Sequence, residues 1–258
     1  MKNIIIITGA SSGFGELFAL QLDGKLKSID EYWLVARNEE KMNEIAKAMS
    51  TPCRILGLDL STEEGVKALI KSVEREADDC DDELYIKMLI NSAGYGKLGQ
   101  FVSNRESDVS GMIDLNVKAL TCITKGLLPY MGENSRIINI ASVAAFLPQP
   151  DFAVYAATKS YVLSFSRALN AELKKYGISV LAVCPGPSST NFFNIAEENQ
   201  KSPWYKKYFM ADPKKVVDKA IHDSINKYDI SVYSMPMKLI RVISRIIPNR
   251  IILNIINK

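Results

Sequence analysis

The chain has 258 residues, of which 47% are hydrophobic and 24% charged, a balance typical of a globular protein with a sizeable core. Its net charge of +3 is small and it has no stripe of interleaved basic and aromatic residues, so we expect no nucleic-acid partner. One histidine and no Cys-x-x-Cys pair among four cysteines argue against the usual zinc sites, and we expect no metal.

The apolar run near the N-terminus is too short for a secretory signal. A glycine-rich turn interrupts it after five residues, and no run approaches the roughly 20 apolar residues that cross a membrane. We therefore expect a cytoplasmic protein.

Apolar runs alternate with segments of helical periodicity along most of the chain. The pattern predicts strands over 3–8, 32–36, 54–58, 86–91, 136–141 and 178–184, and a further short strand over 231–233. It predicts helices over 14–23, 39–49, 62–77, 107–131, 153–176 and 212–227. The runs are continuously apolar, as in parallel sheets whose two faces are both covered by helices. With no linker or repeat, the chain is predicted to be one α/β domain over 1–235, a Rossmann-type doubly wound parallel sheet flanked by helices.

The turn after the first strand indicates a dinucleotide site. Gly9, Gly13 and Gly15 follow the spacing Gly-x-x-x-Gly-x-Gly and lead directly into a helix. A pyrophosphate needs close backbone N–H groups and benefits from the positive end of a helix, and a Cβ would obstruct it. No Lys-Ser/Thr follows the glycines, so the Walker type of nucleotide site is excluded.

The second strand ends without the acidic residue that would hold the 2′-hydroxyl of NAD. Arg37 follows it instead, in the sequence Trp-Leu-Val-Ala-Arg. A guanidinium binds phosphate oxygens through paired hydrogen bonds, so Arg37 favours NADP(H) as the cofactor.

Tyr155 and Lys159 lie one turn apart on a predicted helix, with small residues between them. A nearby ammonium stabilises phenolate and lowers the pKa of a tyrosine from about 10 toward neutrality. The spacing alone is also that of an ordinary pair on a helix face, so it permits Tyr155 to act as a general acid without assigning that role.

These motifs together resemble the short-chain dehydrogenase/reductase family, over about residues 3–230. Asn-Ser-Ala-Gly at 91–94 and Ser142, thirteen residues before Tyr155, fall in the family's order and spacing. The resemblance implies hydride transfer from NADPH to a ketone or aldehyde and a homodimer or homotetramer. Within the family, the segment 91–101 and the C-terminal tail are similar to a bacterial subgroup of broad-range ketone, aldehyde or acyl reductases.

The resemblance also implies roles for single residues. Ser142 holds the substrate carbonyl oxygen, Tyr155 protonates it, Lys159 tunes Tyr155, and Asn116 positions a water that resupplies protons. Cofactor contacts are implied for Ser11, Ser12, Phe14, Asp59, Leu60, Asn91, Ala93, Gly94, Tyr155, Lys159, Pro185, Gly186, Ser188 and Thr190, beside the three glycines and Arg37. Two residues depart from the family pattern: Ser92 replaces an asparagine, and Ser188 replaces an aliphatic residue near the carboxamide.

Two segments add to the domain. The aromatic insertion 187–210 is interpreted as a substrate lid or as a packed surface loop. The tail 236–258 has five cations and no acid, and we expect it to pack on the domain, on another subunit or on the inner membrane surface. Two alternative functions stay open: a 3-ketoacyl thioester reductase of lipid synthesis, and a catalytically weak NADP-binding protein at a membrane.

Overall fold

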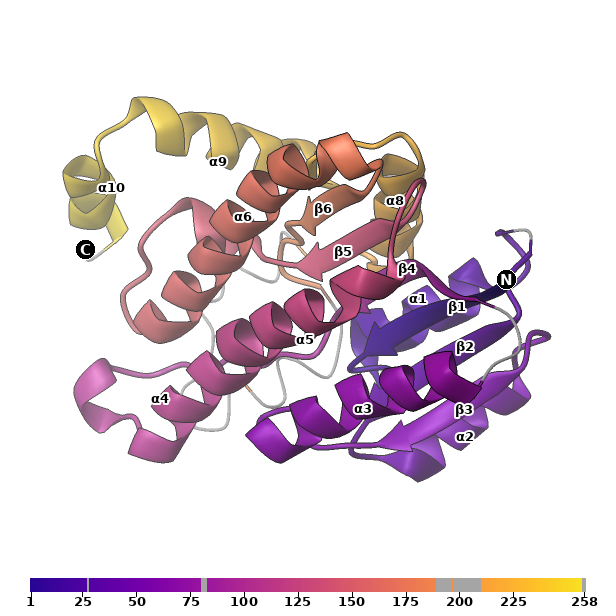
Figure 1. The fold of residues 1–258 in the computed structure, drawn as a ribbon. Coiled ribbons are helices and arrows are strands. Elements are labelled where there is room, and N and C mark those ends of the chain that lie inside the picture. The colour runs from indigo at the N-terminus through magenta and orange to yellow at the C-terminus, as the bar shows by residue number, and fades with distance from the viewer. Residues whose placement is uncertain (27, 80–82, 189–195, 197–209, 257–258) are drawn as a thin grey trace.

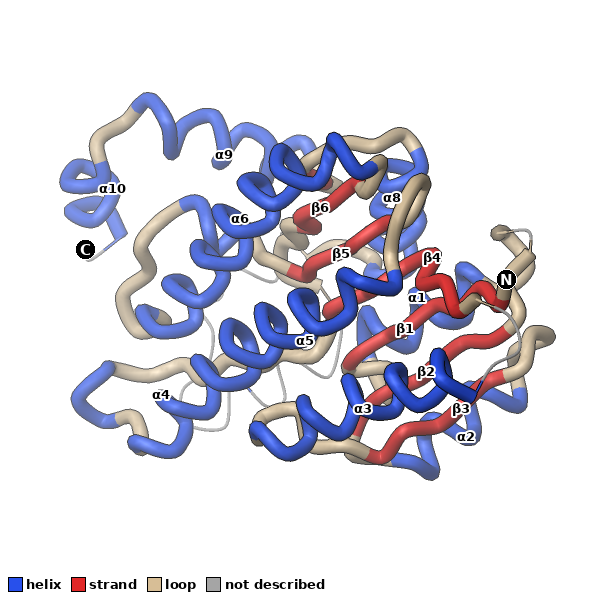
Figure 2. The backbone as a smooth tube through the Cα atoms, viewed as in Figure 1, coloured by secondary structure: helices blue, strands red, loops and turns tan. Residues whose placement is uncertain are grey.

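The computed structural model describes residues 1–26, 28–79, 83–188, 196 and 210–256. Within these residues the strands form one parallel seven-stranded sheet in the order β3-β2-β1-β4-β5-β6-β7 (Figures 1 and 2). The strands are β1 Lys2–Thr8, β2 Glu31–Ala36, β3 Cys53–Gly57, β4 Leu84–Asn91, β5 Arg136–Ile140, β6 Ser179–Val183 and β7 Ile230–Ser231. The strand order reverses between β1 and β4, and ligands of doubly wound sheets bind at the carboxyl end of such a switch point.

Helices cover both faces of this sheet (Figure 1). The α-helices are α1 Gly13–Leu22, α2 Glu39–Lys47, α3 Glu63–Asp79, α4 Glu106–Ile113, α5 Leu120–Leu127, α6 Ala153–Leu173, α8 Pro213–Ile225, α9 Met235–Ile246 and α10 Asn249–Ile256. In Figure 1, α3, α5 and α6 lie in front of the sheet, and α1, α2 and α8 lie behind it. The fold is therefore the predicted single-domain Rossmann-type sheet between two helical layers.

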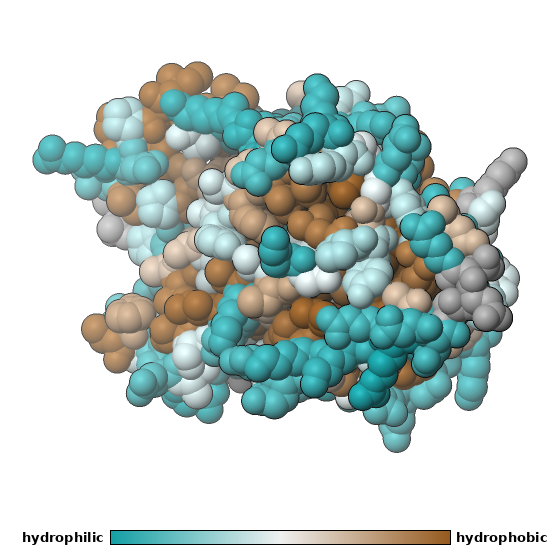
Figure 3. All heavy atoms as spheres, viewed as in Figure 1, coloured by the Kyte–Doolittle hydropathy of each residue, from teal (hydrophilic) through white to brown (hydrophobic). Residues whose placement is uncertain are grey.

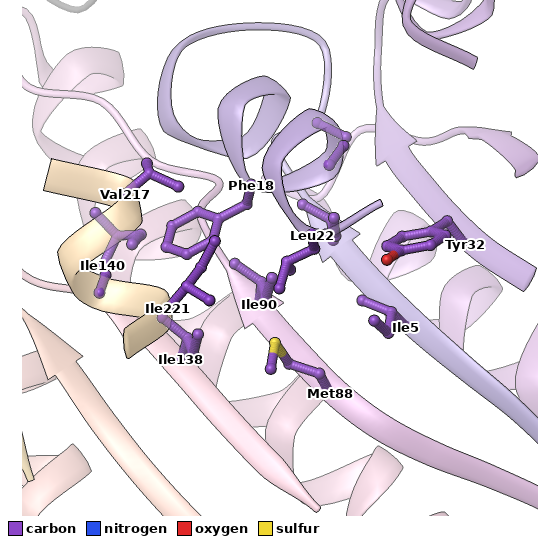
Figure 4. Close-up of a cluster of buried hydrophobic side chains, with 14 of the residues drawn as sticks. Ile5, Phe18, Leu22, Tyr32, Met88, Ile90, Ile138, Ile140, Val217 and Ile221 are labelled. Carbon is purple, nitrogen blue, oxygen red and sulfur yellow. The ribbon is translucent and has the colours of Figure 1, made fainter. Parts of the chain in front are cut away.

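The isoleucine run of β1 supplies both hydrophobic cores. Ile5 and Ile7 belong to the cluster beneath α1, α2 and α8, whereas Ile4 and Ile6 belong to the cluster beneath α3, α5 and α6. Alternate side chains of a strand point to opposite faces, so a continuous apolar run is what a strand buried on both sides requires. Figure 4 shows the first cluster, in which Phe18 of α1 lies among Ile140 of the sheet and Val217 and Ile221 of α8.

The predicted elements are confirmed to within a few residues, with one exception. The helix predicted over 107–131 is interrupted by a π-helical segment, η2 (Asp114–Ala119), between α4 and α5. Such wider turns cannot be read from apolar periodicity, and they occur often at functional sites. This one contains Asn116.

The C-terminal tail forms two helices separated by Pro248. The first, α9, packs against the short 3₁₀ helix η4 (Val143–Phe146), and α10 extends beyond it at the left of Figure 1. Within the described residues no helix combines the length and apolar character needed to cross a bilayer.

Candidate active site

A cleft of about 610 Å³ opens where β1 to β6 end. The segments that follow these strands form its walls, together with the N-terminal half of α6. It brings together most of the residues predicted to bind cofactor or to catalyse: Gly9, Ser11, Ser12, Gly13, Phe14, Arg37, Asp59, Leu60, Ala93, Gly94, Ser142, Tyr155, Lys159, Pro185, Gly186 and Ser188.

The glycine turn has the backbone that the motif predicts. Gly9 and Gly13 adopt φ values of +66° and +59°, which favour glycine over other residues. A Cβ on Gly15 would lie 2.2 Å from the carbonyl oxygen of Gly9, so Gly15 lets α1 begin directly beneath the turn. Ser12, the N-cap of α1, forms no side-chain capping bond, so the first N–H groups of the helix are left for an anion in the cleft. The turn therefore fits a dinucleotide pyrophosphate.

Gly15→Ala tests this close packing. The added methyl group meets backbone atoms of Gly9 and Ala10, which can move only if the whole turn moves. We therefore expect a loss of about 1–3 kcal/mol in the free energy of unfolding, together with weaker dinucleotide binding. Urea denaturation and a cofactor titration measure the two effects. Gly126→Ala in α5 is the matched control, because the three atoms nearest to its added methyl group all belong to the side chain of Ile70 and none to the backbone. Equal stability of the two variants would contradict the expectation.

Thr8 was not predicted and joins two loops of the cleft. Its buried hydroxyl oxygen accepts hydrogen bonds from the backbone N–H groups of Ser92 (3.1 Å) and Ala93 (3.2 Å). The same loops touch at Gly9, where a Cβ would lie 2.8 Å from the Cα of Ala93. The available signal was a hydroxyl residue that follows four consecutive isoleucines at the end of a strand.

Arg37 and Asp59 lie together at the end of the cleft near β2 and β3. Their closest side-chain atoms, Nη1 and Oδ2, are 4.0 Å apart, and the Arg37 side chain is 77% exposed. Partial burial of Asp59 opposes its ionisation, but hydrogen bonds from Ser61 and the charge of Arg37 hold the pKa of this carboxyl below its usual range. An exposed ion pair of this length is weak. The guanidinium of Arg37 is therefore able to turn toward a phosphate.

Three residues predicted to be catalytic converge at the other end of the cleft. Ser142, directly after β5, caps η4 by accepting a hydrogen bond from the Ala144 N–H (3.1 Å), and it also hydrogen bonds the Tyr155 side chain. Lys159, one turn further along α6 than Tyr155, places its Nζ atom 5.7 Å from the centroid of the Tyr155 ring. The same ammonium donates a 2.7 Å hydrogen bond to the Ile140 carbonyl oxygen. The N-cap of η4 and the helix α6 thus hold a hydroxyl, a phenol and an ammonium within one small volume.

Burial dominates the ionisation of this pair. It raises the pKa of Tyr155, and the hydrogen bond from Ser142 offsets this rise only in part. It lowers the pKa of Lys159 to about 8. The predicted net lowering of the Tyr155 pKa is thus absent from the protein alone, because the effect of burial exceeds that of the hydrogen bond from Ser142. A second cation in the cleft is needed to favour phenolate.

Asn116 lies beside the cleft without lining it. Its amide holds the backbone of Tyr95 on both sides, because Oδ1 accepts from the Tyr95 N–H (3.0 Å) and Nδ2 donates to the Tyr95 carbonyl oxygen (2.8 Å). Nδ2 also donates to Thr158 Oγ1 (3.1 Å), next to Lys159 in α6. The side chain therefore links η2, the loop after β4 and α6. The predicted water relay through Asn116 stays a prediction.

Asn91 was predicted to contact the cofactor, but it is not among the residues that line the cleft. Its buried Nδ2 donates to Thr124 Oγ1 (3.0 Å) and to Asn139 Oδ1 (2.9 Å), so the side chain joins β4 to α5 and β5. The physical reason is its direction: at the end of β4 this side chain points into the protein, whereas the backbone of Ala93 and Gly94 reaches the cleft. Asn91 is a structural residue here.

Several residues at the catalytic end were missed. Phe152 stacks on Tyr155 with ring centroids 4.3 Å apart, and Gly96 leaves room for both rings, since a Cβ there would lie within 3.0 Å of each. Tyr95, Lys97, Gln149 and Phe152 line the cleft as well. Single aromatic or polar residues in loops carry no periodic signal, so only the fold places them there.

The proposed lid lies mostly outside the described residues. Thr190 lies outside them too, so its predicted cofactor contact has no structural description. Ser188 and Ala211, at the two ends of the insertion, form an isolated parallel bridge. The carbonyl oxygen of Ala196 accepts a 3.0 Å hydrogen bond from the Leu98 N–H, which ties the insertion to the loop after β4.

The fold and this site together define an α/β oxidoreductase that uses a nicotinamide dinucleotide. Residues 3–201 match the family described as short chain dehydrogenase. An uncharacterized oxidoreductase of Staphylococcus epidermidis is 33% identical over 191 residues, which cover 73% of this chain and 79% of that relative. The chain belongs to the short-chain dehydrogenase family.

Two solved structures extend the comparison. A short-chain dehydrogenase from Sphingobium yanoikuyae in complex with NADPH is 27% identical, with a TM-score of 0.77 over 90% of this chain and 88% of the other. A 3-ketoacyl-(acyl-carrier-protein) reductase from Brucella melitensis complexed with NADH is 25% identical, with a TM-score of 0.72 over 86% and 90%. Both support a nicotinamide cofactor. One structure contains the phosphorylated form, NADPH, and the other contains NADH.

Proposed function

We propose that this protein reduces a ketone or aldehyde with NADPH and that Tyr155 is the general acid. The observation that carries the proposal is one continuous cleft with a phosphate-binding turn at one end and Ser142, Tyr155 and Lys159 at the other. When bound there, the cofactor would supply the hydride. Holding the substrate and managing the proton would fall to the protein.

The geometry supports a separate task for each of the proposed catalytic side chains. The hydroxyl of Ser142 is fixed by its own hydrogen bonds and can orient the substrate carbonyl oxygen beside the Tyr155 phenol. Tyr155 would donate its proton to that oxygen as negative charge develops. The buried ammonium of Lys159 would stabilise the resulting phenolate, an interaction that gains strength where water is excluded. Asn116 acts as a positioning residue through Thr158 and Tyr95.

Preference for NADPH rests on Arg37, the cation that follows β2 where NAD-binding sites of this fold have an acid. Arg37→Ala should weaken NADPH binding about 10-fold or more and leave NADH binding nearly unchanged, because a charged hydrogen bond to a phosphate contributes about 1.5–3 kcal/mol. Nicotinamide fluorescence titrations measure both affinities. Arg75→Ala, an exposed arginine on α3 away from the cleft, is the control. Equal loss of both cofactors in Arg37→Ala would make Arg37 a general anchor and remove the basis for NADPH preference.

The rival substrate is a 3-ketoacyl thioester, the class named for the Brucella relative. Turnover of short 3-ketoacyl thioesters with no turnover of simple ketones and aldehydes would favour it. A catalytically weak binding protein is disfavoured by the complete set of Ser142, Tyr155 and Lys159 in the cleft. The homodimer or homotetramer, the cytoplasmic location and the bacterial subgroup stay predictions.

A further inference from the structure

Helix α9 is attached to the wall of the cleft through one of its faces. Met237 is buried against Gly186, where a Cβ would lie 3.0 Å from its Cγ atom, and Gly186 lines the cleft. Met237 and Ile240 also belong to the cluster that contains Val143 and Phe146 of η4. This inner face accounts for only part of the helix's apolar surface.

The outer face of α9 exposes an apolar stripe. Met235, Leu239, Val242 and Ile246 are 73%, 60%, 52% and 74% exposed. Their spacing of four, three and four residues places them in one line along the helix. In Figure 3, hydrophobic spheres lie beside hydrophilic ones at the upper left, where Figure 1 places α9. A line of four exposed large apolar side chains indicates an interaction surface for another protein or for a membrane.

Cations flank this stripe on one side. Lys238 and Arg245 are exposed and lie roughly 70–90° around the helix from the stripe. Residues 230–258 contain no aspartate or glutamate. The surface is thus apolar along one line and cationic along the next, which is the pattern of helices that lie on anionic membranes.

A hollow of about 300 Å³ lies on the cationic side, between α8 and α9. Lys219 and His222 from α8 and Lys238 and Arg241 from α9 contribute to its lining. The carboxylate of Asp223 also lines it, but Asp223 is buried and its oxygens accept hydrogen bonds from Lys219 at 2.8 and 2.9 Å. The balance of charge in the hollow remains positive and suits a phosphate group.

We propose that the outer face of α9 docks on an anionic membrane surface. The stripe Met235, Leu239, Val242 and Ile246 would enter the boundary between headgroups and acyl chains, and the flanking cations would contact lipid phosphates. A second copy of the chain fits this face less well. A two-fold contact through the stripe with the two α9 helices antiparallel would bring Lys238 and Arg245 of both copies to the same edge, with no carboxylate from this segment to neutralise them.

Vesicle co-sedimentation of the full chain tests the proposal. We expect binding to vesicles of phosphatidylglycerol and phosphatidylethanolamine, little binding to phosphatidylcholine vesicles, and a loss of binding between 0.1 and 1 M NaCl. The triple variant Leu239→Ser/Val242→Ser/Ile246→Ser and the double variant Lys238→Gln/Arg245→Gln should each lower the partition coefficient about 10-fold or more. Leu20→Ser/Ile225→Ser, which removes exposed apolar side chains from α1 and α8, should bind like the unaltered protein.

The substituted positions are exposed, so thermal unfolding should show all variants folded. The proposal would be overturned if the full chain did not bind anionic vesicles. It would also be overturned if the triple variant and the unaltered protein sedimented with these vesicles to the same extent. Equal binding to phosphatidylcholine would overturn the role of the cations. A shift of the triple variant to a smaller mass in lipid-free size-exclusion chromatography, without any vesicle binding by the unaltered protein, would show that a second copy covers this face.

Discussion

Tyr155→Phe should reduce carbonyl turnover by on the order of 10²–10⁴-fold while NADPH binding persists. The phenylalanine ring retains the stacking on Phe152 and the burial, and only the hydroxyl that hydrogen bonds Ser142 and carries the proton is lost. Steady-state rates on a ketone and aldehyde panel, together with a cofactor titration, measure the two effects separately. Loss of turnover with retained binding identifies Tyr155 as the acid rather than as a cofactor anchor.

Tyr161→Phe is the matched control for this substitution. Tyr161 lies on the same helix, is 40% exposed and does not line the cleft. Its hydroxyl group forms a 3.0 Å hydrogen bond with the hydroxyl group of Thr121. Its removal should leave rates within about twofold, since exposed substitutions usually have small effects. Similar losses in both variants, or full activity of Tyr155→Phe, would place the proton donor elsewhere.

Lys159→Met should also cause a large loss, on the order of 10²–10³-fold, because it removes the cation that faces the developing phenolate. Methionine keeps an unbranched apolar stem in the same buried volume. The Ile140 carbonyl oxygen then loses its 2.7 Å donor, which costs about 1–3 kcal/mol of unfolding free energy. Chemical denaturation separates that loss of stability from the loss of rate. Lys174→Met, at an exposed lysine of the same chain region, should change neither.

The pH profile gives this residue its own signature. Burial lowers the pKa of Lys159 to about 8, so the ammonium loses its charge as the pH rises through that value. We expect kcat/KM for reduction to fall above about pH 8. The same ionisation raises stability between about pH 8 and the ordinary value of 10.5, because only the unfolded chain holds the proton there. The loss of activity is therefore distinguishable from unfolding. A falling limb that persists in Lys159→Met would assign the titration to another group.

Residues whose roles depend on spacing along the chain could be predicted. Gly9, Gly13 and Gly15 are recognisable because a turn between a strand and a helix imposes local backbone requirements. Tyr155 and Lys159 are recognisable because four residues make one helical turn, whatever surrounds the helix.

Residues whose roles depend on contacts between distant segments could not be predicted. Thr8 acts through the backbone of Ser92 and Ala93, more than eighty residues away. Asn91 carries a family motif but turns into the protein toward Thr124 and Asn139. Nothing in the local sequence shows which way such a side chain points.

By itself, the sequence determined the strand and helix pattern, the class of fold and the set of candidate catalytic residues, because apolar periodicity and short-range spacing are written along the chain. The tertiary structure alone decided the π-helical turn at Asn116, the pairing of Arg37 with Asp59, the balance of burial and charge at Tyr155, and the exposure of the apolar stripe on α9. These depend on which segments meet in space and how much water they exclude. Such quantities arise only once the sheet has assembled.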